Sequence, residues 1–523
     1  MVQSLNSPLA YFENVTGGEF VPRLVSWLIL SFAFYSYGTN PALYIISIIF
    51  VWLLAVFIME KIVRKTLGKR CSLTFAVMAP FPFFSSSIFY NAYYFAEYGF
   101  SILFMSLHLL LIYYYVVRGN ILTYWFSYAF LILSMLCLSI ILPFLLISVF
   151  LPILLEIERE KQSFIRITLG MVKKYIAPVF VICTVFVFLK LFGPKGSAVE
   201  EIYGLYSLDI KSVLQAAYYF LVLIVEIPVM LFEVIPYSFS LKGMLITLLV
   251  ISYLLLVNYG DSRSEISKDL MNSKRLTMAK LFAISLSSGS LIFLISAYPA
   301  TSFGFYTKMM IPAFMIWSIL LSFIITNTLR NSSLKFVGMA AIVLGVNSMN
   351  VQLENFVHAW QLRTVIYNDI STKLEENDIT EDILLIANVP FFLDNNYNNE
   401  EIVFMIGNFD AGLKYSGVTN VNAWPICWRI LNERTFYPAH NLLTQKNRID
   451  MSKKMWYYQY SSHNELASSL TAIQDQQALG KVLTEARNDS INYHTVITRE
   501  KMRKTLMEAS LVRRLYNSTI PNS

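Results

Sequence analysis

The feature that most constrains this chain is an apolar run followed at once by a cluster of basic residues. The run from Ala42 to Met59, ALYIISIIFVWLLAVFIM, is long enough to cross a bilayer. The segment behind it carries five basic residues: Lys61, Arg64, Lys65, Lys69 and Arg70. Basic residues collect at the cytoplasmic ends of membrane helices, so the run predicts a crossing from outside to inside. This assignment sets the direction of every later crossing.

Composition agrees with a membrane protein that crosses several times. Of 523 residues, 56% are hydrophobic and only 14% are charged, which is too apolar for a chain soluble throughout. From Val351 onward there are 17 Lys/Arg and 19 Asp/Glu, so the excess of positive charge lies in the first 350 residues. A basic membrane part with a nearly neutral tail makes nucleic acid a poor partner. The four cysteines form no CxxC pair and predict no disulfide framework.

The apolar runs predict about ten transmembrane helices, at residues 42–59, 72–90, 99–117, 121–137, 139–155, 175–192, 244–257, 281–297, 309–326 and 335–351. The segment 24–38 is short and carries Ser, Tyr and Trp, so we expect it to lie at the membrane interface. The segment 216–239 contains Glu226, Glu233 and two prolines, which favours a re-entrant or interfacial pair of half-helices. With that segment not crossing, the basic residues between Arg263 and Lys280 form a cytoplasmic loop, and both termini lie outside.

The tail, residues 352–523, is long enough for a small domain. HAWQLRTVIYNDISTKLEEN has helical spacing, whereas DILLIANVPFF and EIVFMIGNF are typical of short buried strands. We expect AWPICWRILNERTF to be helical and the chain after Lys446 to be polar and mostly helical. The predicted fold class is therefore an all-α polytopic membrane bundle, residues 1–351, with a small C-terminal α/β extracytoplasmic domain.

Three acids fall on the outer face in this topology and are candidates for a general base: Glu13, Glu19 and Glu97. Each has a plainer interpretation as a solvated charge near a helix start or in the aromatic belt. Arg23 follows the first two, and Tyr94 lies beside the third.

A cation stands at the outer mouth of a late span, in AYPATSFGFYTKMMIPAF. Lys308 can pair with a lipid phosphate, and Tyr306 beside it can line a substrate site. Snorkelling of a lysine at a helix end and an aromatic belt explain the same residues. Five histidines without shared spacing predict no metal site, and His108 within a span predicts helix packing. A divalent cation held by acids alone is left open.

The order of these elements resembles the polytopic GT-C glycosyltransferases, and among them the bacterial glucosyltransferases that modify O-antigen. The similar pieces are GGEFVPRLVSWLILSFAFYSYG, the span and basic segment after it, NAYYFAEYG, the tight hairpin ending at Glu156, and YPATSFGFYTKMMIPAF. The resemblance implies an enzyme of the bacterial inner membrane. It would take a hexose from a polyprenyl-phosphate carrier to a periplasmic glycan, with no cofactor required.

The chain departs from the family pattern at its start. The family's acidic loop follows a first span and often carries an Asp pair, but here no Asp occurs before Asp209, and Glu19 stands where Arg is common. Either further residues precede Met1, or Glu13 or Glu19 substitutes, or the chain is an inactive relative.

The alternative from another class is a transporter or flippase-type membrane protein, for which we would expect polar residues lining several spans and internal repeat symmetry.

Overall fold

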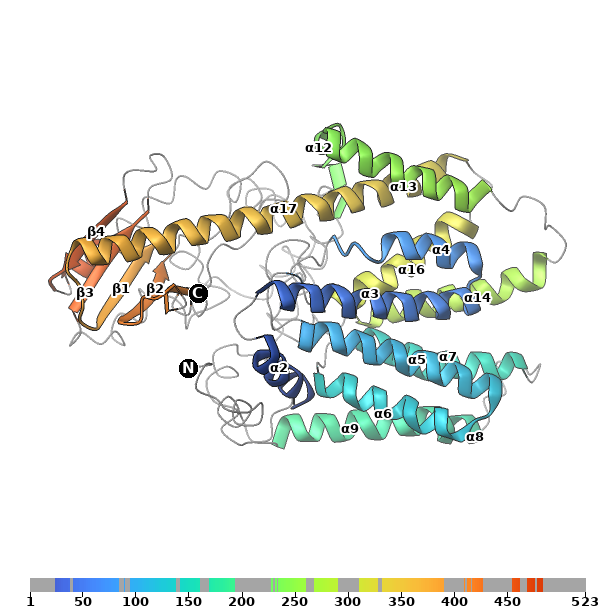
Figure 1. Cartoon of the computed structure of the whole chain (residues 1–523). Coiled ribbons are helices and arrows are strands. Elements are labelled where there is room, and N and C mark those ends of the chain that lie inside the picture. Colours follow the sequence, from blue (N-terminus) through green and yellow to red (C-terminus); the bar gives the residue numbers. More distant parts are fainter. Residues whose placement is uncertain are drawn as a thin grey trace, which may run out of the picture.

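The computed structural model describes the following residues of the chain: 24–37, 41–83, 89, 95–137, 142–159, 169–192, 227–228, 231–232, 234–259, 268–289, 310–327, 332–389, 409, 412–414, 416–426, 454–460, 468–475 and 477–482. Apolar helices run side by side in one part, and a small sheet lies beyond one end of them (Figure 1).

The helical part contains α-helices and two short π-helical turns, labelled η. Their bounds are α2 Leu24–Tyr37, α3 Pro41–Thr66, α4 Lys69–Met78, η3 Phe95–Gly99, α5 Phe100–Arg118, α6 Ile121–Cys137, α7 Leu142–Arg159, α8 Leu169–Met171, η5 Val172–Ile176, α9 Ala177–Phe192, α12 Ile235–Ser238, α13 Leu241–Tyr259, α14 Lys268–Gly289, α16 Ile311–Asn327 and α17 Ser332–Glu376.

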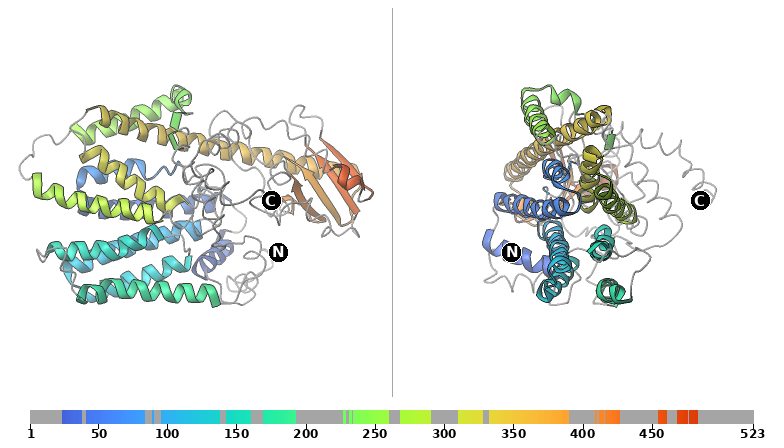
Figure 2. Two further views of the ribbon diagram at one scale, coloured as in Figure 1. Left: turned by 180° about the vertical axis from the view of Figure 1, so that it is seen from behind. Right: turned by 90° about the vertical axis from the view of Figure 1, so that its right-hand side faces the viewer.

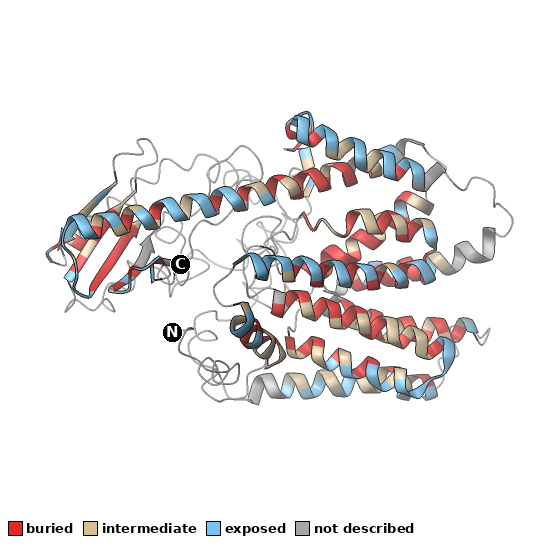
Figure 3. Ribbon diagram, in the orientation of Figure 1, coloured by how far each residue is buried: buried red, intermediate tan, exposed pale blue. Residues whose placement is uncertain are grey.

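Three of the described helical stretches are long and apolar enough to cross a membrane: Ala42–Thr66, Ala96–Arg118 and Phe336–Glu376. Large apolar side chains on the outer sides of the bundle are exposed, among them Phe50 (65%), Phe180 (68%) and Leu256 (75%). Figure 3 shows such exposed positions along α3, α9 and α13, with buried positions turned inward. Exposed apolar surface of this extent is what a lipid-facing surface requires. The chain is therefore an integral membrane protein.

Each expected span contains a described helix, although the total of ten crossings stays a prediction. The prediction for 121–137 coincides with α6. The prediction for 72–90 is wrong directly after Met78, where α4 ends and 79–83 are not helical; 84–88 and 90 lie outside the described residues. Pro80 and Pro82 follow, and a proline removes the backbone donor that the next helical turn needs.

The basic segments expected as loops are mostly helical. Arg64 and Lys65 lie in the last turn of α3, and only Leu67 and Gly68 separate α3 from α4. The segment 268–280 forms the first half of α14. Long side chains can carry charge beyond the hydrocarbon region from a continuing helix, so a charge cluster marks the boundary without ending the helix.

The basic residues gather at one end of the bundle, which we call the basic end. Arg118 ends α5, Arg159 ends α7, and Lys174 lies near the start of α9. Arg275 of α14 lies against Gly68 in the turn after α3. Gly68 has a φ of 100°, which glycine adopts without strain. We call the opposite end, toward the sheet, the sheet end (Figure 1).

Polar side chains join α5 to α6 within the apolar bundle. Ser101 and Ser134 donate to each other's backbone carbonyls at 3.1 and 2.7 Å. His108, fully buried, brings its Nδ1 to 2.8 Å from the hydroxyl of Ser127. Hydrogen bonds of this kind hold transmembrane helices together. His108 thus has the helix-packing role predicted from the sequence.

The helix α17 runs through both parts of the molecule, as the view from behind shows (Figure 2). Its 45 residues span roughly 68 Å at about 1.5 Å per residue, twice the ~30 Å of a bilayer core. It includes the predicted helix HAWQLRTVIYNDISTKLEEN except for its last residue, Asn377, which lies in a turn. The expected domain boundary at residue 351 falls inside this helix, and the division into two domains stays a prediction.

Four strands form the sheet in the order β2-β1-β3-β4: β1 Ile383–Asn388, β2 Val421–Ile426, β3 Lys454–Gln459 and β4 Ser469–Ile473. The strand β1 lies parallel to both β2 and β3, and β4 is antiparallel to β3. One face packs on the outer half of α17 through Ile366, Ile370 and Leu385. The other face packs through Ile386, Tyr457 and Leu479.

The sheet confirms one tail prediction and corrects two. The predicted strand in DILLIANVPFF is β1. AWPICWRILNERTF was expected to be helical, but its first four residues, from Ala423, belong to β2. The chain after Lys446 was expected to be mostly helical, yet it supplies β3 and β4. The run MWYYQ within β3 is rich in aromatic residues, which fit a pleated, half-buried surface. EIVFMIGNF lies almost wholly outside the described residues.

Candidate functional site

Of the predicted site residues, the structure describes Glu97 and leaves six outside the described residues: Glu13, Glu19, Arg23, Tyr94, Tyr306 and Lys308. The structure therefore tests the surroundings of Glu97 and the ends of the helices to which the others are joined. It does not bring the predicted residues together into one described constellation.

Glu97 lies at the sheet end of the bundle, in the π-helical turn η3 that opens α5. Its neighbours Ala96 and Tyr98 are buried, while Glu97 itself is half-buried. A single π-helical turn is uncommon and is found frequently at functional sites. Glu97 is therefore a half-buried acid at the sheet end of the apolar bundle, and its role as a general base on the outer face stays a prediction.

The short helix α2 lies across the same end of the bundle and packs on η3 and α3. Leu30 and Ala33 contact the cluster that contains Ala96. Tyr37 of α2 and Tyr44 of α3 meet edge to face, with their ring centres 5.2 Å apart. The helix α2 thus lies across helix ends at the sheet end of the bundle, and its place at the membrane interface stays a prediction.

A second region of the sheet end lies where α4, α16 and α17 meet. Phe83, just beyond α4, packs edge to face on Phe314 and Trp317 of α16. The carbonyl of Phe83 accepts a hydrogen bond of 2.7 Å from Gln352 of α17. A Cβ on Gly345 would lie 2.9 Å from the Phe83 ring, so glycine is needed for this approach.

The face of α17 that meets this region is polar and buried. Asn347, Ser348, Gln352 and Asn355 are each less than 5% exposed. Asn347 donates to Thr247 of α13 at 3.1 Å. Buried polar groups in a membrane bundle are costly unless they are paired or line a polar site. The sequence signal for this face is the polar run NSMNVQLEN, which lies across the end of the predicted span 335–351 and was not among the predicted site residues.

A charged pair stands beside this polar face. Glu354 of α17 forms an ion pair with Lys242 of α13 and accepts a hydrogen bond of 3.2 Å from Tyr237 of α12. Asn350 donates to the same tyrosine oxygen. Burial, helped by the negative charge of Glu354, raises the pKa of Tyr237 to about 12, so its hydroxyl stays a donor at neutral pH. These contacts fix α12 and α13 to α17. The half-helix α12 belongs to the segment expected to be re-entrant or interfacial, of which 227–228, 231–232 and 234–239 are described; Glu226 and Glu233 lie outside the described residues.

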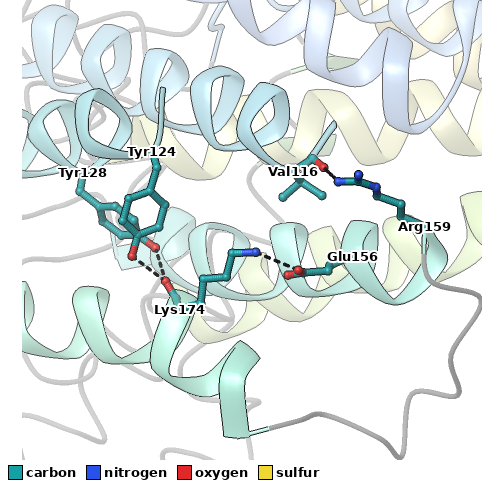
Figure 4. Close-up of polar contacts among 6 residues, drawn as sticks. All are labelled: Val116, Tyr124, Tyr128, Glu156, Arg159 and Lys174. Atoms are coloured by element: carbon teal, nitrogen blue, oxygen red, sulfur yellow. Dashed lines mark hydrogen bonds and ion pairs between the residues drawn. The ribbon is translucent and has the colours of Figure 1, made fainter. Parts of the chain in front are cut away.

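The basic end holds a cluster of different composition (Figure 4). Lys174 pairs with Glu156 of α7 at 2.8 Å, and its ammonium lies 4.9 Å from the ring centre of Tyr115. The hydroxyl of Tyr124 donates to the Lys174 carbonyl at 2.9 Å. Arg159 donates to the carbonyl of Val116 at 2.7 Å. The cluster joins α5, α6 and α7 to η5 at the start of α9, and its ion pair and hydrogen bonds run between these elements, as expected of a structural contact.

Within the part of the chain that the structure describes, no group of three or more His, Cys, Asp or Glu side chains is arranged to hold a metal ion.

No protein-family model matches this sequence, and no curated protein matches it either. Among solved structures, the chain is similar to the crystal structure of ArnT from Cupriavidus metallidurans bound to undecaprenyl phosphate. The TM-score is 0.37 and the identity 11%, over 86% of this chain and 87% of that chain.

Proposed function

We propose that this protein is an integral membrane glycosyltransferase that moves a hexose, with glucose as the first choice, from a polyprenyl-phosphate carrier to a cell-surface glycan such as O-antigen. The observation that carries the proposal is the sheet end of the bundle. There a half-buried acid on a π-helical turn and a buried polar face of α17 adjoin a small α/β unit outside the apolar helices. The resemblance of the outer segments to GT-C enzymes supports the choice of reaction.

The proposed reaction is a displacement at the anomeric carbon of the donor sugar. One of the acids Glu13, Glu19 and Glu97 accepts the proton of an acceptor hydroxyl while the hydroxyl oxygen bonds to that carbon. The bond from carbon to phosphate oxygen breaks, and polyprenyl phosphate leaves. Lys308 and Arg23 stabilise the leaving phosphate. The aromatic rings of Tyr306 and Tyr94 line the substrate.

In the proposed orientation the sheet end faces the periplasm of a bacterial inner membrane, and the basic end faces the cytoplasm. The gathering of Arg118, Arg159 and Lys174 at one end supports this direction, because Lys and Arg are enriched on the cytoplasmic side.

The test is a transfer assay with the full-length protein in lipid nanodiscs. Undecaprenyl-phosphate glucose, radiolabelled in the sugar, is incubated with lipopolysaccharide from a strain that lacks the gene, and label in the lipopolysaccharide is counted. We expect transfer with the wild type and a loss of about 10²-fold or more when the base is removed by Glu13→Gln, Glu19→Gln or Glu97→Gln. Glu60→Gln, which removes an acid near the basic end of α3, is the matched control and should retain activity.

Absence of label in the lipopolysaccharide with every wild-type preparation would contradict the proposed reaction. Retention of full transfer by all three Gln variants would contradict the proposed base. Movement of the intact glycolipid between leaflets without transfer would favour the transporter alternative.

A further inference from the structure

The three parallel strands of the sheet end on the side that faces the bundle. The helix α17 leads away from the bundle to Glu376, and β1 starts seven residues later and runs back along the helix. Tyr458, at the penultimate position of β3, donates a hydrogen bond of 2.7 Å to Asp369 of α17. Asp369 precedes the end of α17 by two turns, so the last residues of β3 lie beside a part of the helix that is nearer to the bundle. The carboxyl ends of β3 and of its parallel neighbours β1 and β2 therefore point toward the sheet end of the bundle.

The strand order places a topological switch point between β1 and β3. From β1 the chain first adds β2 on one side and then crosses to add β3 on the other. In open parallel sheets, ligands bind outside the carboxyl ends of the strands at the point where the order reverses. Here the backbone pairing continues one step past β3, where Tyr460 donates to the carbonyl of Asn388 at 3.0 Å.

Three neutral polar side chains lie abreast at this carboxyl edge. Asn388 is the register partner of Gln459, and Gln459 is the register partner of Ser469. Side chains alternate along a strand, so all three lie on the face opposite α17, the face that also carries Ile386 and Tyr457. Asn388 and Gln459 are half-buried, and Ser469 is exposed. The apolar face therefore ends in a polar row at the switch point.

We propose that this row, Asn388, Gln459 and Ser469, is a binding site for a neutral sugar unit of a glycan. Amide and hydroxyl groups each offer donors and acceptors, which match the hydroxyl groups of a sugar. None of the three carries a charge, so the row lacks the cation that a phosphate or nucleotide would favour. The role of this site as an acceptor subsite rests on the proposed function, whereas the binding itself does not.

The distance along α17 sets the kind of acceptor. Glu354 is bound to α13 of the bundle through Lys242, and Asp369 is bound to Tyr458, the neighbour of Gln459 in the row. At about 1.5 Å per residue these positions are roughly 22 Å apart. A glycan held at the row must therefore be an extended chain of several sugars to reach chemistry at the bundle.

The experiment measures glycan binding without any donor. Full-length protein in nanodiscs is immobilised, and the probe is the soluble polysaccharide released by mild acid from the surface of the organism's own cells. We expect saturable binding, weakened about tenfold in the Asn388→Ala, Gln459→Ala double variant, because the hydrogen bonds of both amides to the sugar are lost. Asn422→Ala removes an exposed amide at the other end of the same sheet and should bind as the wild type does.

A separate variant protects the test against misfolding. If the double variant loses its cooperative thermal transition, Ser469→Ala, at an exposed position, replaces it and should weaken binding severalfold. Equal binding by wild type and the folded row variants, or no polysaccharide binding by the wild type, would overturn the proposal. If the wild type binds UDP-glucose and the row variants bind it more weakly, the row is a nucleotide site and the proposal is wrong. Because no donor is present, the outcome is independent of the transfer assay.

Discussion

The ion pair between Lys174 and Glu156 predicts a measurable stability effect at the basic end. The two atoms lie 2.8 Å apart, and the side chains are 33% and 17% exposed. The second oxygen of Glu156, Oε2, is buried without a hydrogen-bond partner. Replacing Lys174 with Met would leave both carboxylate oxygens poorly solvated and without an ion-pair partner.

The magnitude follows from this partial burial. Breaking a fully buried pair costs about 3–5 kcal/mol, and an exposed pair contributes less than about 1 kcal/mol. With one partner a third exposed, we expect Lys174→Met to cost about 2 kcal/mol. The Lys174→Met, Glu156→Met double variant should cost less than the single variant, because no unpaired charge remains.

The assay is thermal unfolding of the full-length protein in nanodiscs, followed by tryptophan fluorescence. Lys173→Met is the matched control, because Lys173 is the exposed neighbour of Lys174 on the same turn, and it should leave the apparent Tm unchanged. The reasoning would be refuted if the double variant unfolded at the same temperature as Lys174→Met or below it. The loss of stability would then not come from the unpaired carboxylate of Glu156.

Two further predictions concern the sheet and its helix. Burial and the hydrogen bond to Asp369 raise the pKa of Tyr458 above its ordinary range. The hydroxyl thus stabilises the fold fully below about pH 10, the unfolded value, and loses that contribution as the pH rises further. Tyr458→Phe should lower the free energy of unfolding by about 1 kcal/mol at pH 7 and reduce the fall in Tm between pH 7 and 11, measured by thermal unfolding. An equal fall in Tm in the wild type and the variant would contradict this. Inserting two alanines after Val357 should rotate the sheet by about 200° and abolish glycan transfer, whereas four alanines rotate it by about 40° and should retain part of it; equal activity of the two insertions would contradict the proposed orientation.

The helices were predictable because apolar runs are a strong, local signal. The run 121–137 coincides with α6, and the basic residues near Lys61 and Arg275 do meet at one end of the bundle. The ends of helices were less predictable, since Pro80 stops α4 within an apolar run, whereas α17 continues through polar residues. Whether a helix continues past its apolar part depends on what its polar half packs against, which in α17 is a sheet assembled from distant segments.

The sheet was only partly predictable for the same reason. The strand β1 is a continuous apolar run, ILLIAN, and can be recognised alone. The strand β2, VNAWPI, contains a proline and is a strand because it pairs with β1 at the edge of the sheet. Glu97 was found from its place in a short loop between spans. The polar row at Asn388 and Gln459 depends on register between residues 71 positions apart, which no local pattern contains.

The continuity of α17 explains how one chain can place a sheet at a defined height above a membrane bundle. A flexible linker would let the carboxyl edge of the sheet sample many orientations, at an entropic cost whenever a glycan had to be presented to the bundle. In this chain Gly345 and Gln352 attach one half of the helix to α4 and α16, and Asp369 and Ile370 attach the other half to the sheet. The rotation of the sheet about the helix axis is therefore set by the number of residues between Gln352 and Asp369. Because the helix is continuous, that number also sets the orientation of the polar row relative to the bundle. The proposed acceptor site therefore depends on residue spacing along α17 as well as on the side chains that contact the sugar.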